Sequence, residues 1–207
     1  MPLKEHRVQP GPALPLKAGD ALLAVDVQAD FLAGGSLAVP RGDEVAPVHN
    51  VYLALFRLVG LPVLATRDWY PGTQVSFQAQ GGPWPPHSVA GTSGARFAPG
   101  LRRPADAGVI SKATEPQRGA YSAFEGTELD HLLHQAGVGR LFIGGRATDY
   151  CVRNTVLDAL ALGYQTCLLQ DAIRAVEVQP GAGLCALAQM LQQGAQAVTL
   201  QQIRVAA

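Results

Sequence analysis

The fold of this 207-residue chain can be inferred from residues 21–27, Ala21-Leu-Leu-Ala-Val-Asp26-Val27. A short, continuous apolar run of this kind is typical of a β-strand that is buried on both faces, as the strands of parallel sheets are. Asp26 stands where that strand ends. Because ligands bind beyond the carboxyl ends of parallel strands, a carboxylate at this position is a candidate functional group.

Apolar runs and amphipathic segments alternate along the rest of the chain. Strands are expected at 62–66, 108–111, 141–144, 164–169 and 197–200, and helices at 43–59, at 128–136, from 151 onward and around 184–191. Strand–helix alternation of this kind places helices on both faces of a parallel sheet. The sequence therefore predicts one three-layer α/β domain with a central, mostly parallel sheet of about six strands and a Rossmann-like topology.

Two of the predicted helices carry leucines that are expected to face the sheet: Leu129, Leu132 and Leu133 in one, and Leu184, Leu187 and Leu191 in the other. Residues 1–19 are rich in Pro, Gly and Lys and are expected to form an irregular lead-in to a domain of residues 20–207. Residues 69–104 contain many Pro and Gly and no sustained period. A long ordered excursion of this kind within a compact domain is usually functional.

Composition narrows the class of protein. Hydrophobic residues make up 48% of the chain and charged residues 15%, which is typical of a globular enzyme. Sixteen Lys and Arg offset sixteen Asp and Glu, with no basic cluster, so neither a nucleic acid nor a membrane is expected as a partner. With no membrane-length apolar run and no signal-peptide core, a cytoplasmic protein is expected. The composition leaves a homo-oligomer open.

The three cysteines, Cys151, Cys167 and Cys185, are far apart and include no Cys-x-x-Cys pair, which argues against a disulfide framework or a cysteine-rich zinc site. Cys167 lies within a predicted strand and Cys185 beside Leu184 on a helix stripe, so both are expected in the core. Cys151 instead opens a helix, with Thr148 and Asp149 as candidate caps. Because a helix N-terminus favours negative charge, we expect it to lower the pKa of this thiol.

Three reactive side chains are predicted to meet at the carboxyl edge of the sheet. Asp26 ends the first strand, Lys112 follows the third and Cys151 follows the fourth. Each alone is most simply a turn Asp, a solvated Lys or a small buried Cys. Together they supply the thiol, the base and the cation that activated-thiol catalysis needs.

Seven pieces of the chain, in order, carry a resemblance to a known family. They are Asp26-Val-Gln-Ala-Asp-Phe31, Gly34-Gly-Ser-Leu, Thr66-Arg-Asp-Trp69, Trp84-Pro-Pro-His87, Lys112, Ala120-Tyr-Ser-Ala-Phe-Glu-Gly126 and Ala147-Thr-Asp-Tyr-Cys-Val-Arg153. The chain resembles the nicotinamidase/pyrazinamidase branch of the isochorismatase-like cysteine hydrolases from about Ala21 to its C-terminus.

The resemblance implies a catalytic role for each member of the triad. Asp26 would be the general base that takes the proton of the Cys151 nucleophile, and Lys112 would lie against both. The backbone N–H groups of Ala147 and Cys151 would form the oxyanion hole, and the Arg146–Ala147 peptide bond would be cis.

Other matched residues imply a substrate pocket. Phe31, Trp84 and Tyr150 would line a pocket for a flat heteroaromatic ring. Asp30 is expected to be a turn or orienting residue. Of the histidines outside the matched motifs, His131, His134 and His49 are expected on the surface, and His6 falls in the lead-in.

The chain departs from the resemblance at the metal site. Family members hold a divalent ion with an Asp and two His, and here only Asp68 and His87 match, with Tyr70 and Gln74 where His is usual. A phenol and a carboxamide are poor replacements for imidazole as ligands of zinc, iron or manganese. No cofactor is expected to be required for the acyl chemistry. A tightly bound metal is not expected, and weak binding of zinc, iron or manganese stays open.

Three hypotheses for function remain open. The first is hydrolysis of nicotinamide, through a thioester, to nicotinate and ammonia. The second, suggested by Tyr70 and Gln74, is hydrolysis of another small amide, ureido or carbamoyl compound. The third is a non-catalytic small-molecule-binding or scaffold protein of the same fold, against which the complete triad argues. The absence of a G-x-G-x-x-G after the first strand argues against a dinucleotide-binding dehydrogenase, and the absence of a His motif to accompany Cys151 argues against a papain-like protease.

Overall fold

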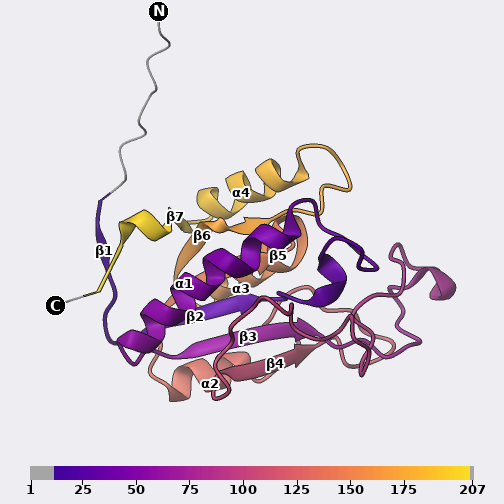
Figure 1. The fold of residues 1–207 in the computed structure, drawn as a ribbon, viewed down its shortest axis with the longest axis horizontal. Helices are drawn as coiled ribbons and strands as arrows, with labels where there is room; N and C mark the ends of the chain where they lie inside the picture. Colours follow the sequence, from indigo (N-terminus) through magenta and orange to yellow (C-terminus); the bar gives the residue numbers. More distant parts are fainter. Residues whose placement is uncertain (1–11, 206–207) are drawn as a thin grey trace, which may run out of the picture.

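The computed structural model describes residues 12–205, which form a three-layer α/β domain (Figure 1). Six parallel strands make the central sheet, in the order β4-β3-β2-β5-β6-β7. Their bounds are β2 Asp20–Val25, β3 Val63–Asp68, β4 Gly108–Lys112, β5 Arg140–Arg146, β6 Gln165–Arg174 and β7 Gln196–Val198. The predicted fold class is therefore confirmed.

Helices cover both faces of the sheet, because alternate residues of each buried strand point to opposite sides. On one face, Leu22 of β2 packs with Tyr52 and Phe56 of α1 (Val45–Leu58). On the other, Leu23 packs in a cluster that includes Val156. The helices of that second face are α2 (Leu129–Gln135), α3 (Arg153–Ala161) and α4 (Ala182–Gln192).

The strand order reverses between β2 and β5, which is where an open parallel sheet forms its ligand crevice. The two strands approach closely at their carboxyl ends. Gly145 has a φ of +139°, and a Cβ added there would lie 1.9 Å from the carbonyl oxygen of Val25. Glycine therefore lets β5 run close against β2, so that Asp26 and Ala147 leave the sheet at the same edge.

The long segment from Trp69 to Pro104 is the excursion that the sequence predicts. It contains only one short helix, η3 (Gln78–Gln80), and isolated bridges such as Tyr70 with Val89 and Phe77 with Trp84. In Figure 1 most of it lies beyond the arrowheads of β3 and β4. Three of its buried side chains, Tyr70, Phe77 and His87, gather at the carboxyl edge of the sheet.

The lead-in has more structure than its composition indicates. Residues 1–11 lie outside the described residues, but β1 (Leu14–Pro15) pairs in parallel with β8 (Ile203–Arg204), and Leu16 is buried against α1. Two predicted helix stripes are partly wrong. Leu132 is exposed in α2, and on α4 Leu184 and Leu191 are exposed, with Leu184 72% accessible.

The buried face of α4 consists of Gly183, Ala186 and Met190 instead. Small residues are needed there, because a Cβ added at Gly183 would lie 2.6 Å from the Cβ of Ala175. No helix among residues 12–205 is both long and apolar enough to cross a membrane.

Candidate active site

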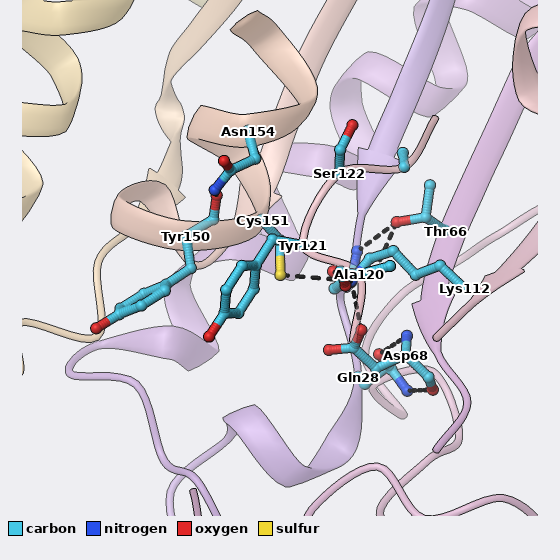
Figure 2. Close-up of polar contacts among 12 residues, drawn as sticks. Gln28, Thr66, Asp68, Lys112, Ala120, Tyr121, Ser122, Tyr150, Cys151 and Asn154 are labelled. Carbon is cyan, nitrogen blue, oxygen red and sulfur yellow. Dashed lines mark hydrogen bonds and ion pairs between the residues drawn. The ribbon is translucent and has the colours of Figure 1, made fainter. Parts of the chain in front are cut away.

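Lys112 is the centre of a buried polar cluster at the edge of the sheet. Its ammonium lies 3.0 Å from Oδ2 of Asp26, contacts Oδ1 of Asp68, and lies 3.5 Å from Sγ of Cys151. It also donates to the carbonyl oxygen of Ala120 at 3.2 Å. Figure 2 shows the contacts of Lys112 with Asp68 and Cys151. Burial alone would lower the pKa of Lys112, but the two carboxylates outweigh it and raise the pKa well above its usual range.

Asp26 follows β2 directly and is fully buried. Its Oδ1 accepts a hydrogen bond of 2.6 Å from the hydroxyl of Thr66 at the neighbouring strand β3. Its backbone has a φ of +49°, in the left-handed region that Asp tolerates better than most residues. Burial raises the pKa of this carboxyl group to about 6, with Lys112 acting in the opposite direction. A base with such a pKa is ionised at neutral pH and still accepts a proton readily.

Cys151 lies in η4 (Thr148–Val152), a five-residue π-helix that precedes α3, and is 5% exposed. Burial raises the pKa of its thiol well above the usual value. Lys112 acts in the opposite direction, and the negative charges of Asp26 and Asp68 raise the pKa further. The expectation of a pKa lowered by a helix N-terminus is therefore wrong. The protonated thiol lies beside a carboxylate that can take its proton.

Asp149 and Thr148 do not cap the helix as predicted, since neither side chain makes a cap hydrogen bond there. Asp149 instead accepts hydrogen bonds from the backbone N–H groups of Val176 and Glu177 at 2.9 and 3.0 Å. It thereby ties the segment after β6 to η4, and this segment brings Val176 to the wall of the cavity next to Cys151. The Arg146–Ala147 peptide bond that precedes η4 is cis, as the resemblance implies.

A cavity lined largely by aromatic side chains opens beside Cys151. Its walls include all three residues predicted for the ring pocket, Phe31, Trp84 and Tyr150, and also Leu37, Asp68, Tyr70, His87, Tyr121 and Val176. Trp84 and Tyr150 meet edge to face with ring centroids 5.0 Å apart. Figure 2 shows the rings of Tyr150 and Tyr121 on the Cys151 side. Aromatic walls of this kind suit a flat, largely apolar ligand.

The cavity has two chemically different ends. We call Asp26, Lys112 and Cys151 the thiol end. The aromatic end comprises Phe31, Tyr70, Trp84 and His87. Asp68 lies between them, since it contacts Lys112 and also lines the cavity.

The residues predicted for a metal site are in part brought together. Asp68, His87 and Tyr70 line the same cavity, with the rings of Tyr70 and His87 edge to face at 5.1 Å. Nδ1 of His87 donates to the carbonyl oxygen of Pro85 at 2.8 Å, which leaves Nε2 for a ligand. Gln74 does not line the cavity, and its amide nitrogen donates to the carbonyl oxygen of Arg118 at 3.0 Å.

A second group of possible metal ligands is formed by Asp26, Asp68 and Cys151, whose ligand atoms all lie within 4.8 Å of one another. The ammonium of Lys112 already contacts each of these three residues. A divalent cation among them would be repelled by that ammonium at short range. The geometry therefore favours Lys112 as the cation of this cluster.

Sequence reasoning missed three side chains that hold the site. Thr66 orients Asp26, as described above. Gln28 is fully buried, donates to the carbonyl oxygen of Asp68 at 2.8 Å and accepts from the N–H of Asp68 at 2.8 Å. The hydroxyl of Tyr121 accepts a hydrogen bond from Nε1 of Trp84 at 3.0 Å. Gln28, Thr66 and Tyr121 all fall inside the quoted motifs, which is the signal that could have identified them.

Asp30 has the orienting role that was expected. Its Oδ2 accepts from the N–H of Ser88 at 2.7 Å and its Oδ1 from the N–H of Ser36 at 3.2 Å, so it fixes the chain next to His87. His49, by contrast, was expected on the surface and is fully buried, with Nδ1 near the carbonyl oxygen of Val45. His131 and His134 are exposed as expected, and His6 lies outside the described residues.

The other two thiols differ from one another. Cys167 is buried in β6, as predicted, and Cys185 is exposed on α4, which contradicts the expectation that it is core. Cys185 is exposed because α4 packs on the sheet through the face that carries Gly183 and Ala186. An alkylating reagent will therefore find Cys185 readily, and labelling order does not identify the nucleophile.

The chain was compared with known proteins. A family model described as the isochorismatase domain matches residues 20–202. The nicotinamidase of Escherichia coli (strain K12) is 39% identical over 201 residues, which cover 87% of this chain and 94% of that protein. The structure of the pyrazinamidase of Pyrococcus horikoshii in complex with zinc has a TM-score of 0.84 and 46% identity, over 88% of this chain and 99% of that one. The structure of L. infantum PnC1 in complex with nicotinate has a TM-score of 0.87 and 34% identity, over 94% and 100%.

The fold and these matches define the class: the chain belongs to the isochorismatase family. Within that family it falls in the nicotinamidase/pyrazinamidase branch, and it is an amidohydrolase of the nicotinamidase type. The predictions of family, fold and enzyme class made from the sequence motifs are thus confirmed.

Proposed function

We propose that this protein hydrolyses nicotinamide to nicotinate and ammonia through a thioester on Cys151. The observation that supports this most strongly is the position of the Cys151 thiol, which lies against Lys112 and close to Asp26 and faces an aromatic-walled cavity. The similarity to nicotinamidases supports the choice of substrate.

In the first half-reaction, Asp26 takes the proton of the Cys151 thiol as the sulfur attacks the carboxamide carbon. The electrons of the carbonyl double bond move to its oxygen, which the N–H groups of Ala147 and Cys151 stabilise as the oxyanion hole. When the carbonyl re-forms, the C–N bond breaks and Asp26 gives its proton to the departing nitrogen. Ammonia leaves, and the acyl group remains on Sγ as a thioester.

In the second half-reaction, a water molecule attacks the thioester carbon while Asp26 takes one of its protons. Collapse of this intermediate breaks the C–S bond, and the sulfur recovers a proton from Asp26. The acid product ionises and leaves. Lys112 keeps its charge throughout and stabilises the ionised forms of Asp26 and Cys151 in turn, because its pKa is raised far above neutrality.

We further propose that a divalent metal is not required for this acyl chemistry. The candidate ligands are Asp68, which lies between the two ends and is already paired with Lys112, and Nε2 of His87 at the aromatic end. The Tyr70 phenol is a poorer ligand for these metals than an imidazole, and Gln74 is turned to Arg118. A zinc, iron or manganese ion bound there would act at the substrate ring, through Asp68 and His87.

A small carboxamide panel tests this function directly. Ammonia release should be measured with nicotinamide, pyrazinamide, benzamide, a ureido compound and a carbamoyl compound, each with chelator and with added zinc. Nicotinamide turnover that survives the chelator is expected. Turnover of only the ureido or carbamoyl compound would favour the second enzyme hypothesis, which Tyr70 and Gln74 suggest. Tight binding without turnover of any member would favour a binding protein.

The cellular setting is also a proposal. All three cysteines are free thiols, which suits a reducing compartment such as the cytoplasm. The expected partner is the small-molecule amide alone.

A further inference from the structure

Tyr70 is a buried polar residue that the reaction described above does not use. It is 4% exposed and lines the cavity together with Cys151 and His87. Its hydroxyl makes no hydrogen bond with residues 12–205. By contrast, the hydroxyl of Tyr121, which lines the same cavity, accepts a hydrogen bond from Nε1 of Trp84. A hydroxyl without a protein partner is satisfied by water, and a ligand that displaces this water has to supply an acceptor in its place.

The ring of Tyr70 is held in a fixed orientation. Phe77 packs against it edge to face at 5.4 Å and His87 at 5.1 Å. The backbone is held as well, since the N–H of Tyr70 donates to Ser88 at 3.1 Å and its carbonyl oxygen accepts from Ala90 at 2.8 Å. The hydroxyl is therefore a pre-positioned group.

The chemistry of this group is that of a donor. A tyrosine hydroxyl, whose ordinary pKa is about 10, keeps its proton at neutral pH. A neutral phenol offers one O–H to a ligand acceptor. The carboxamide of a bound substrate is needed at the thiol end, with its carbon at Sγ of Cys151. The hydroxyl of Tyr70 is thus left for an acceptor on the ring.

We propose that Tyr70 is a specificity-determining residue, whose hydroxyl donates a hydrogen bond to an unprotonated ring nitrogen of an aromatic carboxamide without the help of a metal ion. This inference rests on the proposed function and narrows its substrate class to carboxamides of nitrogen heteroaromatics. An in-plane nitrogen lone pair suits the site because Phe31, Trp84 and Tyr150 can hold a flat ring in the cavity that Tyr70 also lines.

Binding to variants that cannot turn over tests the inference. Cys151→Ala and the double variant Cys151→Ala/Tyr70→Phe are titrated calorimetrically with nicotinamide and with benzamide, which has C–H in place of the ring nitrogen, in the presence of a chelator. Loss of one neutral hydrogen bond should weaken nicotinamide binding about 3- to 10-fold and leave benzamide within about twofold.

Cys151→Ala/Tyr121→Phe is the matched control. It removes the hydroxyl of another tyrosine from the same cavity, but that hydroxyl already accepts from Trp84. We expect this change to alter the binding of nicotinamide and benzamide by similar factors. Equal weakening of both ligands by Tyr70→Phe would mean that Tyr70 only shapes the cavity, and would overturn the inference. A preference for nicotinamide that arises only with added zinc would overturn it too.

The inference and the proposed function can fail separately. Ammonia release from nicotinamide by the unmodified protein, without a Tyr70-dependent preference in binding, would contradict only the inference. A Tyr70-dependent preference in binding, without any ammonia release, would contradict only the proposed function.

Discussion

The thiol end and the aromatic end of the cavity differ in how their polar atoms are satisfied. At the thiol end, Thr66 and Lys112 contact the two oxygens of Asp26, and the ammonium of Lys112 also contacts Cys151. At the aromatic end, the hydroxyl of Tyr70 and Nε2 of His87 have no partner among residues 12–205. The groups that we propose to react are thus in contact with one another in the free protein, whereas the hydroxyl that we propose to recognise the substrate has no protein partner among the described residues.

This difference has a physical reason. Proton transfer needs the donor, the acceptor and the counter-charge in contact, and a half-satisfied charge cluster would be costly to bury. Recognition needs unsatisfied groups whose partner is the ligand itself. Changes at the thiol end should therefore act on turnover, and changes at the aromatic end on affinity.

The largest effect is expected from Cys151→Ala. Removal of the nucleophile should lower kcat by at least about 10⁴-fold, as loss of a nucleophile does in other triads, while the thermal midpoint changes little because Ala fits the space of Cys. Cys167→Ala is the control: it should cost roughly 1 kcal/mol of stability and retain activity. Ammonia release and thermal unfolding measure both. Comparable activity in the Cys151 variant would exclude a thioester at this residue.

The next largest effect is expected from Asp26→Asn. Loss of the general base should lower kcat/KM by about 10²- to 10⁴-fold, with little change in substrate affinity.

In the unmodified protein the same group sets the pH dependence. Asp26 must be ionised to accept the thiol proton, so kcat/KM should be constant above its pKa of about 6 and fall as the pH drops below it. Measurement of kcat/KM from pH 4.5 to 8 should show this decline on the acid side, which we call the acid limb. An acid limb that persists unchanged in Asp26→Asn would assign it to another group.

At the aromatic end, Tyr70→His tests the metal. An imidazole beside Asp68 and His87 would complete a three-ligand site. Metal occupancy after dialysis should rise from well below one ion per chain toward one, and KM for nicotinamide should fall more than kcat changes, because an anchor on the ring contributes mainly uniform binding. Elemental analysis of the unmodified protein, Tyr70→Phe and Tyr70→His provides the comparison. A stoichiometric, dialysis-resistant transition metal in the unmodified protein would show that Asp68 and His87 suffice.

The smallest effect is expected from Thr66→Val. It removes the 2.6 Å hydrogen bond to Asp26, which favours the ionised carboxylate and so lowers its pKa. Loss of a bond of about 1 kcal/mol should move the acid limb of kcat/KM upward by somewhat less than one pH unit. The plateau above pH 7.5 should stay nearly the same. A lower plateau with an unmoved limb would mean that Thr66 supports the fold and not the ionisation of Asp26.

The sequence predicted the sheet well and the helix faces less well. Each strand of the parallel sheet is buried on both sides, so its apolar run is visible without knowledge of its neighbours. The helix α4 has leucines on more than one side, and a choice between them depends on what approaches it. The sequence pattern predicts that the leucines face the sheet. The close contact with Ala175 requires Gly183 on that face instead, so Leu184 and Cys185 are exposed.

In the site, too, some features could be predicted from the sequence and others could not. Asp26, Lys112 and Cys151 were predictable because each ends or follows a strand, and parallel strands bring these positions to one edge. The hydrogen bond that lowers the pKa of Asp26 was not, because Thr66 comes from a strand that is distant in sequence. The local helix argument predicts a lowered pKa for Cys151, but burial and the negative charges of Asp26 and Asp68 raise that pKa more than Lys112 lowers it.

By itself, the sequence determined the family, the parallel sheet and the chemical set of a thiol, a carboxylate and an ammonium, because periodicity and motif are local properties of the chain. Only the tertiary structure decided how those groups are charged and which polar atoms stay open. Burial and long-range contacts determine both: Asp68 is paired with Lys112, Gln74 is turned away to Arg118, and the hydroxyl of Tyr70 is left at the cavity without a protein partner among the described residues.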